Sequence, residues 1–169
     1  MDPSVVAYKS VLKQIILHCD QSEMVHKILN EDVFICSLLA YKEELFNHIV
    51  TTTNVKESSI RLLKPHNKVY ETLFNLSILS LRYMSVLKPR DHQEIIQENL
   101  ALFIRKNQDY GDSFQDFQMI GIIVRLNDKI NRLLTLMRNK TLQVKDEAIE
   151  DTMNDLYNYG ILALMYKEK

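Results

Sequence analysis

The chain has 169 residues, of which 46% are hydrophobic and 25% are charged, and its formal net charge is −1. This length is enough for one substantial core, and the near-neutral charge gives no general attraction to nucleic acid or to an anionic membrane. Only three glycines and three prolines interrupt the chain, which favours long helices over a sheet with many turns. We therefore predict an all-α protein, a bundle of about six to eight helices.

The cysteines and the N-terminal residues indicate the cellular compartment in which we expect the protein. Two cysteines, Cys19 and Cys36, are too few for a disulfide framework and fit a reducing compartment. We interpret both as small buried hydrophobic residues. Lys9 and Lys13 interrupt the N-terminal stretch, which therefore lacks the apolar region of a signal peptide. No run reaches the roughly 20 apolar residues that a membrane span needs. We expect a cytoplasmic protein with no membrane partner and no direct binding to nucleic acid.

The first half of the chain predicts helices separated by short breaks. Asp2 and Pro3 begin a helix that runs to about Cys19. The pattern of apolar residues then predicts helices over 22–29, 31–50, 58–63 and 66–87. Between the second and third of these, Thr51 to Asn54 are poor helix formers, so we expect a loop there.

Two sets of residues in this half could have either a functional role or an ordinary structural one. Glu43 and Glu44 could begin a metal or general-base motif, but we interpret them as a solvated helix face. The five histidines are scattered without a pair four residues apart, which argues against a zinc site.

A break at Pro89 to Asp91 is the best domain boundary. We expect a helical region of unknown role over 1–88 and a second domain over 89–169. The second domain should begin with a helix over 92–107 and a turn over 109–113, where Gly111 is free to adopt a positive φ angle.

The next helix, about 116–138, is apolar on most of its surface. One seam follows the three-then-four spacing of a packed helix: Met119, Ile123, Leu126, Ile130, Leu133 and Met137. A single charged stripe contains Arg125, Asp128, Lys129 and Arg132. A helix of this kind is usually central in a bundle, so we expect the stripe to face a partner, a ligand or a water-filled cleft.

The last helix, about 145–166, carries an acidic face. Glu147, Asp151 and Asp155 recur every four residues, and Glu150, Asn154 and Asn158 widen that face. Like charges at this spacing destabilise a helix, so something should offset them. Carboxylate oxygens suit Mg²⁺, which makes a magnesium site one interpretation. A solvated face near the helix N-terminus is the other.

These residues resemble a known family. The pattern DYG, a Phe, R-x-x-D-K-x-x-R-L and D-E-x-x-x-D-x-x-x-D-L-x-x-Y is similar to nucleotide modification associated domain 1, a small all-helical domain common in bacteriophages. That domain is in turn similar to the all-alpha NTP pyrophosphatases, which include MazG and the dimeric dUTPases. The matching residues are Asp109, Tyr110, Gly111, Phe114, Arg125, Asp128, Lys129, Arg132, Leu133, Asp146, Glu147, Asp151, Asp155, Leu156 and Tyr159.

The resemblance implies a Mg²⁺-dependent (deoxy)nucleoside triphosphate pyrophosphohydrolase that forms a homodimer. It implies Asp128 and Asp151 as catalytic residues, and metal ligands at Asp128, Glu147, Asp151 and Asp155. Nucleotide contacts would come from Arg125, Lys129, Arg132, Tyr110 and Asn158, and arginine and lysine are suited to phosphate oxygens. The three basic residues could also bridge the two helices by balancing the acids of the last one, and Tyr110 could instead be a core residue.

Two other functions remain open. The first helix of the pattern offers one acid, Asp128, among three basic residues, where MazG-like enzymes have an E-x-x-E motif. This departure supports a nucleotide-binding module without turnover. A helical viral or phage interaction protein without nucleotide chemistry is the second alternative.

Overall fold

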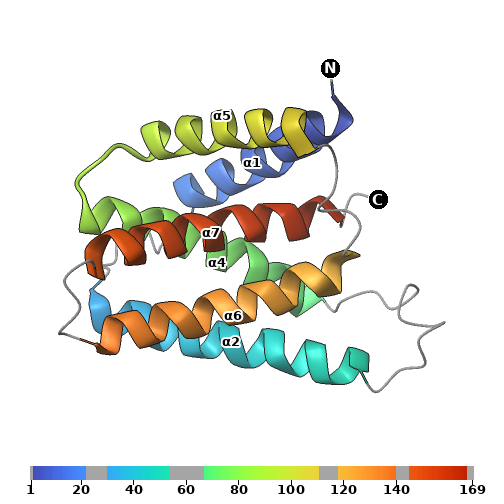
Figure 1. Cartoon of the computed structure of the whole chain (residues 1–169). Helices are drawn as coiled ribbons and strands as arrows, with labels where there is room; N and C mark the ends of the chain where they lie inside the picture. Colours follow the sequence, from blue (N-terminus) through green and yellow to red (C-terminus); the bar gives the residue numbers. More distant parts are fainter. Residues whose placement is uncertain (1, 22–29, 54–66, 111–117, 140–144, 167–169) are drawn as a thin grey trace.

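The computed structural model describes residues 2–21, 30–53, 67–110, 118–139 and 145–166. This part of the chain contains six helices and no strands, which confirms the all-α prediction (Figure 1). The helices are α1 Pro3–Gln21, α2 Glu31–Thr53, α4 Asn67–Leu87, α5 His92–Tyr110, α6 Gln118–Arg138 and α7 Lys145–Met165.

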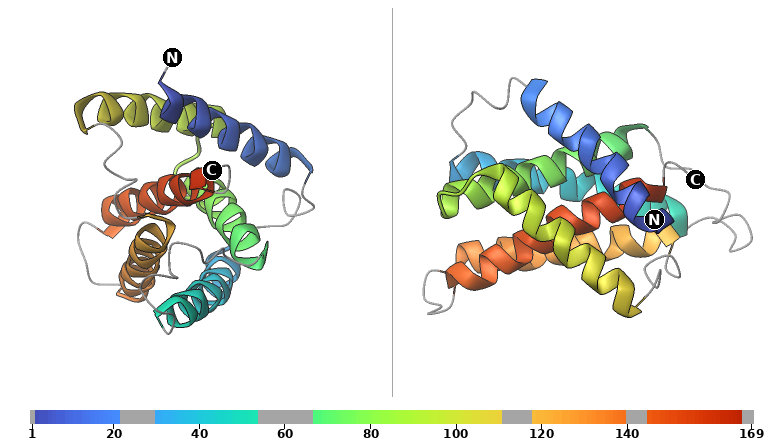
Figure 2. Two further views of the ribbon diagram at one scale, coloured as in Figure 1. Left: turned by 90° about the vertical axis from the view of Figure 1, so that its right-hand side faces the viewer. Right: turned by 90° about the horizontal axis from the view of Figure 1, so that it is seen from above.

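Four of these helices form a bundle. α7 packs against α4 and α6, and α2 packs against the same two helices from the opposite corner (Figure 2). α1 and α5 form a further layer on the side of α4 and α7. One hydrophobic core receives buried side chains from all six helices, among them Tyr8, Leu38, Leu79, Ile96, Ile130 and Leu156. Helices on both sides of the break at 88–91 therefore share one core.

Side-chain caps begin three of the helices. The Oδ1 atom of Asp2 accepts a hydrogen bond from the Ser4 backbone N–H at 2.8 Å, and that of Asn30 accepts from Val33 at 2.9 Å. Asp91 caps α5 in the same way, at 3.2 Å from Gln93 N. Each cap satisfies a backbone N–H that the first helical turn leaves without a partner.

The expected loop at Thr51–Asn54 is wrong for the threonines, because α2 continues through Thr53. The Thr51 hydroxyl donates to the carbonyl of Asn47 at 2.8 Å, so a polar side chain is satisfied inside the helix. The expected turn at 109–113 also begins later, since α5 continues through Tyr110. Asn54, Gly111, Phe114 and the helices expected over 22–29 and 58–63 lie outside the described residues.

The predicted buried seam of α6 is confirmed. Ile123, Leu126, Ile130, Leu133 and Met137 are buried, and Met119 packs partly against the core. Cys19 is buried as expected, whereas Cys36 is exposed on α2, which corrects the interpretation of that residue. None of the described helices combines the length and the apolar character that a membrane span requires.

Candidate functional site

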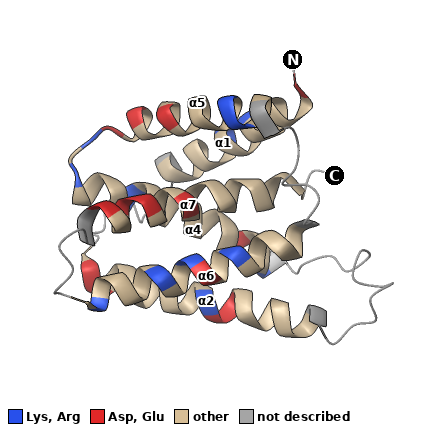
Figure 3. Cartoon of the chain, in the orientation of Figure 1, with Lys and Arg blue, Asp and Glu red and all other residues tan. Residues whose placement is uncertain are grey.

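Seven charged residues of the predicted site lie on two adjacent helices, α6 and α7, and we call this set the charged seam. It comprises Arg125, Asp128, Lys129 and Arg132 of α6 with Glu147, Asp151 and Asp155 of α7. Lys129 and Asp155 are partly exposed and the other five residues are exposed. Figure 3 marks the Lys and Arg positions along the α6 ribbon and the Asp and Glu positions along the neighbouring α7 ribbon.

One ion pair fixes how the two helices meet at this surface. The Nζ atom of Lys129 lies 2.6 Å from Oδ2 of Asp155. The helices run in opposite directions (Figure 1), so Arg132, one turn after Lys129, and Asp151, one turn before Asp155, lie toward the same end of the seam. Lys129 of α6 thus offsets the charge of one of the three acids, Asp155.

The predicted metal ligands are not gathered into a cage. Across residues 2–21, 30–53, 67–110, 118–139 and 145–166, no three His, Cys, Asp or Glu side chains stand close enough together to hold a metal ion. Asp155 is engaged by Lys129, and the Asp128, Glu147 and Asp151 side chains are exposed. Metal binding by these four acids stays a prediction.

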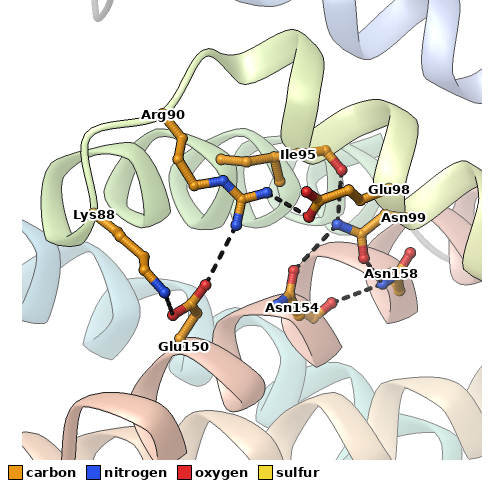
Figure 4. Close-up of polar contacts among 8 residues, drawn as sticks. All are labelled: Lys88, Arg90, Ile95, Glu98, Asn99, Glu150, Asn154 and Asn158. Atoms are coloured by element: carbon orange, nitrogen blue, oxygen red, sulfur yellow. Dashed lines mark hydrogen bonds and ion pairs between the residues drawn. The ribbon is translucent and has the colours of Figure 1, made fainter.

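A second polar face of α7 meets α5 (Figure 4), and α1 reaches the same face through Tyr8. Asn99 of α5, only 5% exposed, donates from Nδ2 to Oδ1 of Asn154 at 3.1 Å and to the Ile95 carbonyl at 2.9 Å. Asn158 donates from Nδ2 to Oδ1 of Asn99 at 2.6 Å and to the Asn154 carbonyl at 3.0 Å. The Tyr8 hydroxyl completes the set by donating to Oδ1 of Asn158 at 2.8 Å. We call these four side chains the asparagine network: Tyr8, Asn99, Asn154 and Asn158.

Ion pairs extend this face toward the start of α7. Glu150 lies 3.6 Å from Nζ of Lys88 and 3.5 Å from a guanidinium nitrogen of Arg90. Arg90 also pairs with Glu98 of α5. All four groups retain some exposure, so each pair contributes at most about 1 kcal/mol. The polar residues of α7 are therefore divided between two neighbours, with Glu150, Asn154 and Asn158 on the α5 side and the charged seam on the α6 side.

Residues 106–166 match the family model of nucleotide modification associated domain 1. This confirms the predicted resemblance to that domain. No curated protein and no solved structure matches the chain. The matched residues, 106–166, contain α6 and α7 with the last turn of α5, and so include the whole charged seam.

Within residues 106–166, the predicted nucleotide-contact residues have different surroundings. Arg125 and Arg132 lie on the charged seam, while Asn158 belongs to the asparagine network. The side chain of Tyr110 lies outside the described residues. Sequence reasoning missed Asn99, because a single asparagine in the predicted helix over 92–107 carries no signal of its partners on α7.

Two buried tyrosines, Tyr8 and Tyr157, lie at or near the asparagine network. Burial raises the pKa of both Tyr8 and Tyr157, and each phenol is next to an ionisable neighbour, Tyr157 for Tyr8 and Cys19 for Tyr157. Tyr157 is fully buried, and its hydroxyl has no hydrogen-bond partner within the described part of the chain. Both phenols are neutral near pH 7, so this pair adds no charge to the site.

Proposed function

We propose that the charged seam binds a nucleotide together with Mg²⁺ and hydrolyses its phosphoanhydride, releasing pyrophosphate or phosphate. The observation that carries this proposal is the pairing of Lys129 with Asp155, at 2.6 Å, inside the matched domain. This pair supports the proposal because it joins a cation suited to phosphate and a carboxylate suited to Mg²⁺, both partly exposed to solvent.

The basic side chains act on the phosphates. Arg125 and Arg132 lie on either side of Lys129 along α6, and guanidinium groups bind phosphate oxygens through paired N–H donors. When a nucleotide binds, Lys129 breaks its ion pair with Asp155 and pairs with a phosphate oxygen instead. The surrounding positive charge then stabilises the negative charge that develops as the phosphoanhydride breaks.

The carboxylates act on the metal and the water. Asp151 and Asp155, with Asp128 and Glu147, supply the hard oxygen ligands that Mg²⁺ prefers. Bound there, Mg²⁺ would polarise the phosphate and lower the pKa of a water molecule. Either Asp128 or Asp151 accepts one proton of that water as the water oxygen bonds to the α-phosphorus. The bond between the α-phosphorus and the bridging oxygen breaks, pyrophosphate leaves with that oxygen, and a nucleoside monophosphate remains. The proposal includes a cytoplasmic location, where nucleotides and Mg²⁺ are available.

A second candidate is nucleotide binding without turnover. Its support is the single acid that α6 contributes, Asp128, and the lack of a ready group of three ligands among the described side chains. A helical interaction protein of viral or phage origin is a third candidate, and it predicts no response to nucleotide or Mg²⁺.

A thermal-shift panel of canonical and modified deoxynucleotides, with and without Mg²⁺, separates these candidates. Ligands that bind the folded state raise Tm, and each stabilising ligand is then assayed for released pyrophosphate and phosphate. A Mg²⁺-dependent rise in Tm with product supports hydrolysis, and a rise without product supports the binding module. The absence of any shift across the panel overturns both.

A further inference from the structure

Lys129 and Asp155 already neutralise each other within the chain. Nζ of Lys129 lies 2.6 Å from Oδ2 of Asp155, which is the distance of a charge-assisted hydrogen bond. The Asp155 side chain is 44% exposed and that of Lys129 is 27% exposed, so Lys129 is the more enclosed partner. A carboxylate with the chemistry of a Mg²⁺ ligand is therefore open to solvent but already has a cation beside it.

An ammonium group and Mg²⁺ compete for this carboxylate. Mg²⁺ binds carboxylate oxygens at about 2.1 Å. A metal ion on Oδ2 of Asp155 would therefore lie less than about 5 Å from Nζ of Lys129, if that group kept its present position. Like charges at this separation repel each other, and more strongly where solvent is partly excluded. Lys129 thus opposes the binding of a metal ion to Asp155.

A phosphate group offers Lys129 another partner. Lys129 lies between Arg125 and Arg132 along α6, about one helical turn from each, and both arginines are exposed. Mg²⁺ is commonly held by one or two carboxylates together with the phosphates of a substrate. The described side chains suit this mode, because no three His, Cys, Asp or Glu residues among them stand close enough to hold a metal ion by themselves.

We propose that Lys129 is an internal counterion that opposes Mg²⁺ binding at Asp155 until a nucleotide phosphate draws it away. This inference rests on the proposed function and adds how the same site is regulated. Metal alone binds weakly, because Lys129 holds the carboxylate. Metal and nucleotide then strengthen each other's binding by the same factor, since coupling between two ligands is reciprocal.

Binding of Mn²⁺ alone, without nucleotide, tests this role. Mn²⁺ takes the same oxygen ligands as Mg²⁺, and electron paramagnetic resonance measures the free ion. Lys129→Met should lower the dissociation constant of Mn²⁺ at least about threefold relative to the parent, because the opposing charge is gone. Lys129→Arg keeps the charge and should bind Mn²⁺ as the parent does. Adding Asp155→Asn to Lys129→Met should abolish the gain.

Lys88→Met is the matched control. Lys88 also pairs with an acid of α7, since its Nζ lies 3.6 Å from Glu150, but Glu150 keeps Arg90 as a second partner. This variant removes the same charge and should leave Mn²⁺ binding unchanged. An equal gain in Lys88→Met would trace the effect to net charge and overturn the proposal. A gain that persists when Asp155→Asn is added to Lys129→Met would overturn it as well.

The counterion role and the proposed function fail separately. A parent that nucleotide and Mg²⁺ stabilise, with a Lys129→Met variant that binds Mn²⁺ no more tightly, overturns the counterion role and leaves the proposed function standing. A Lys129→Met variant that binds Mn²⁺ more tightly, in a chain that no nucleotide stabilises, overturns the proposed function and retains Lys129 as the residue that opposes metal at Asp155.

Discussion

Gly160 of α7 and Ser77 of α4 touch so closely that there is no room for a side chain at position 160. A Cβ atom added to Gly160 would lie 2.0 Å from Oγ of Ser77 and 3.3 Å from the Leu73 carbonyl oxygen. The same Ser77 hydroxyl donates to the Tyr157 carbonyl at 3.1 Å. Glycine is therefore what allows α4 and α7 to pack with their backbones close together.

Gly160→Ala should lower the free energy of unfolding by about 1–3 kcal/mol, because the added methyl displaces Ser77 and separates the helices. Urea unfolding measures the change. The same substitution in a Ser77→Ala background should cost less, since the nearest atom has been removed. Equal costs in both backgrounds would show that Ser77 is not the obstacle.

Asn99→Leu should destabilise the protein by about 1–3 kcal/mol, because Asn154 and Asn158 lose their partner in a largely buried position. Gln97→Leu, at an exposed position of α5, is the control and should have little effect. A double-mutant cycle with Asn158→Ala should give a coupling energy clearly different from zero. Additive effects would mean that the asparagine network does not act as a unit.

Asp151→Asn and Asp155→Asn should each reduce the Mg²⁺-dependent rise in Tm produced by a nucleotide, because each removes a charged oxygen ligand. Glu94→Gln on α5 removes the same charge away from the charged seam and should leave the response unchanged. Lys129→Met should change stability in the absence of ligand by less than about 1 kcal/mol. The same variant should weaken nucleotide binding at least about tenfold. An unchanged Mg²⁺ response in both aspartate variants would contradict the proposed metal site.

His92 makes stability depend on pH. Burial lowers its pKa from 6.5, nearby Arg82 lowers it further, and Asp91 partly opposes the shift. The unfolded chain therefore binds a proton more readily than the folded one, so His92 lowers stability as pH falls below about 6.5. His92→Gln should reduce the difference in unfolding free energy between about pH 7.5 and about pH 5.5. An NMR titration with a His92 pKa at or above the unfolded value would contradict this.

The isolated segment 89–169 should not unfold cooperatively. Ile123, Leu126 and Ile130 of α6 are buried in a bundle to which α2 and α4 also belong, and removing residues 1–88 exposes this apolar face. Circular dichroism during urea titration should show a broad transition, whereas the full chain should show a sharp one. A sharp transition of the segment would establish it as an independent domain.

The sequence alone predicted the helical class, most helix positions and the buried seam of α6. Each of these follows from local sequence pattern. Apolar residues at helical spacing form a face that is buried in a core, and prolines and capping residues mark where helices begin and end. The charged stripe of α6 and the acids of α7 were also visible, because charge is rare on helices that are otherwise apolar. The spacing of residues could not identify a ligand, and the expectation of a nucleotide ligand came from the family resemblance.

Tertiary structure decided which neighbour each side of a helix meets. Asp155 and Asn158 are less than one turn apart, yet Asp155 pairs with Lys129 of α6 while Asn158 bonds to Asn99 of α5. Helical periodicity gives the directions in which side chains point, but it does not say which helix lies in each direction. Cys36 is exposed for the same reason, because α2 stands at a corner of the bundle and only one of its faces reaches the core. The partners of these side chains follow from how the six helices pack.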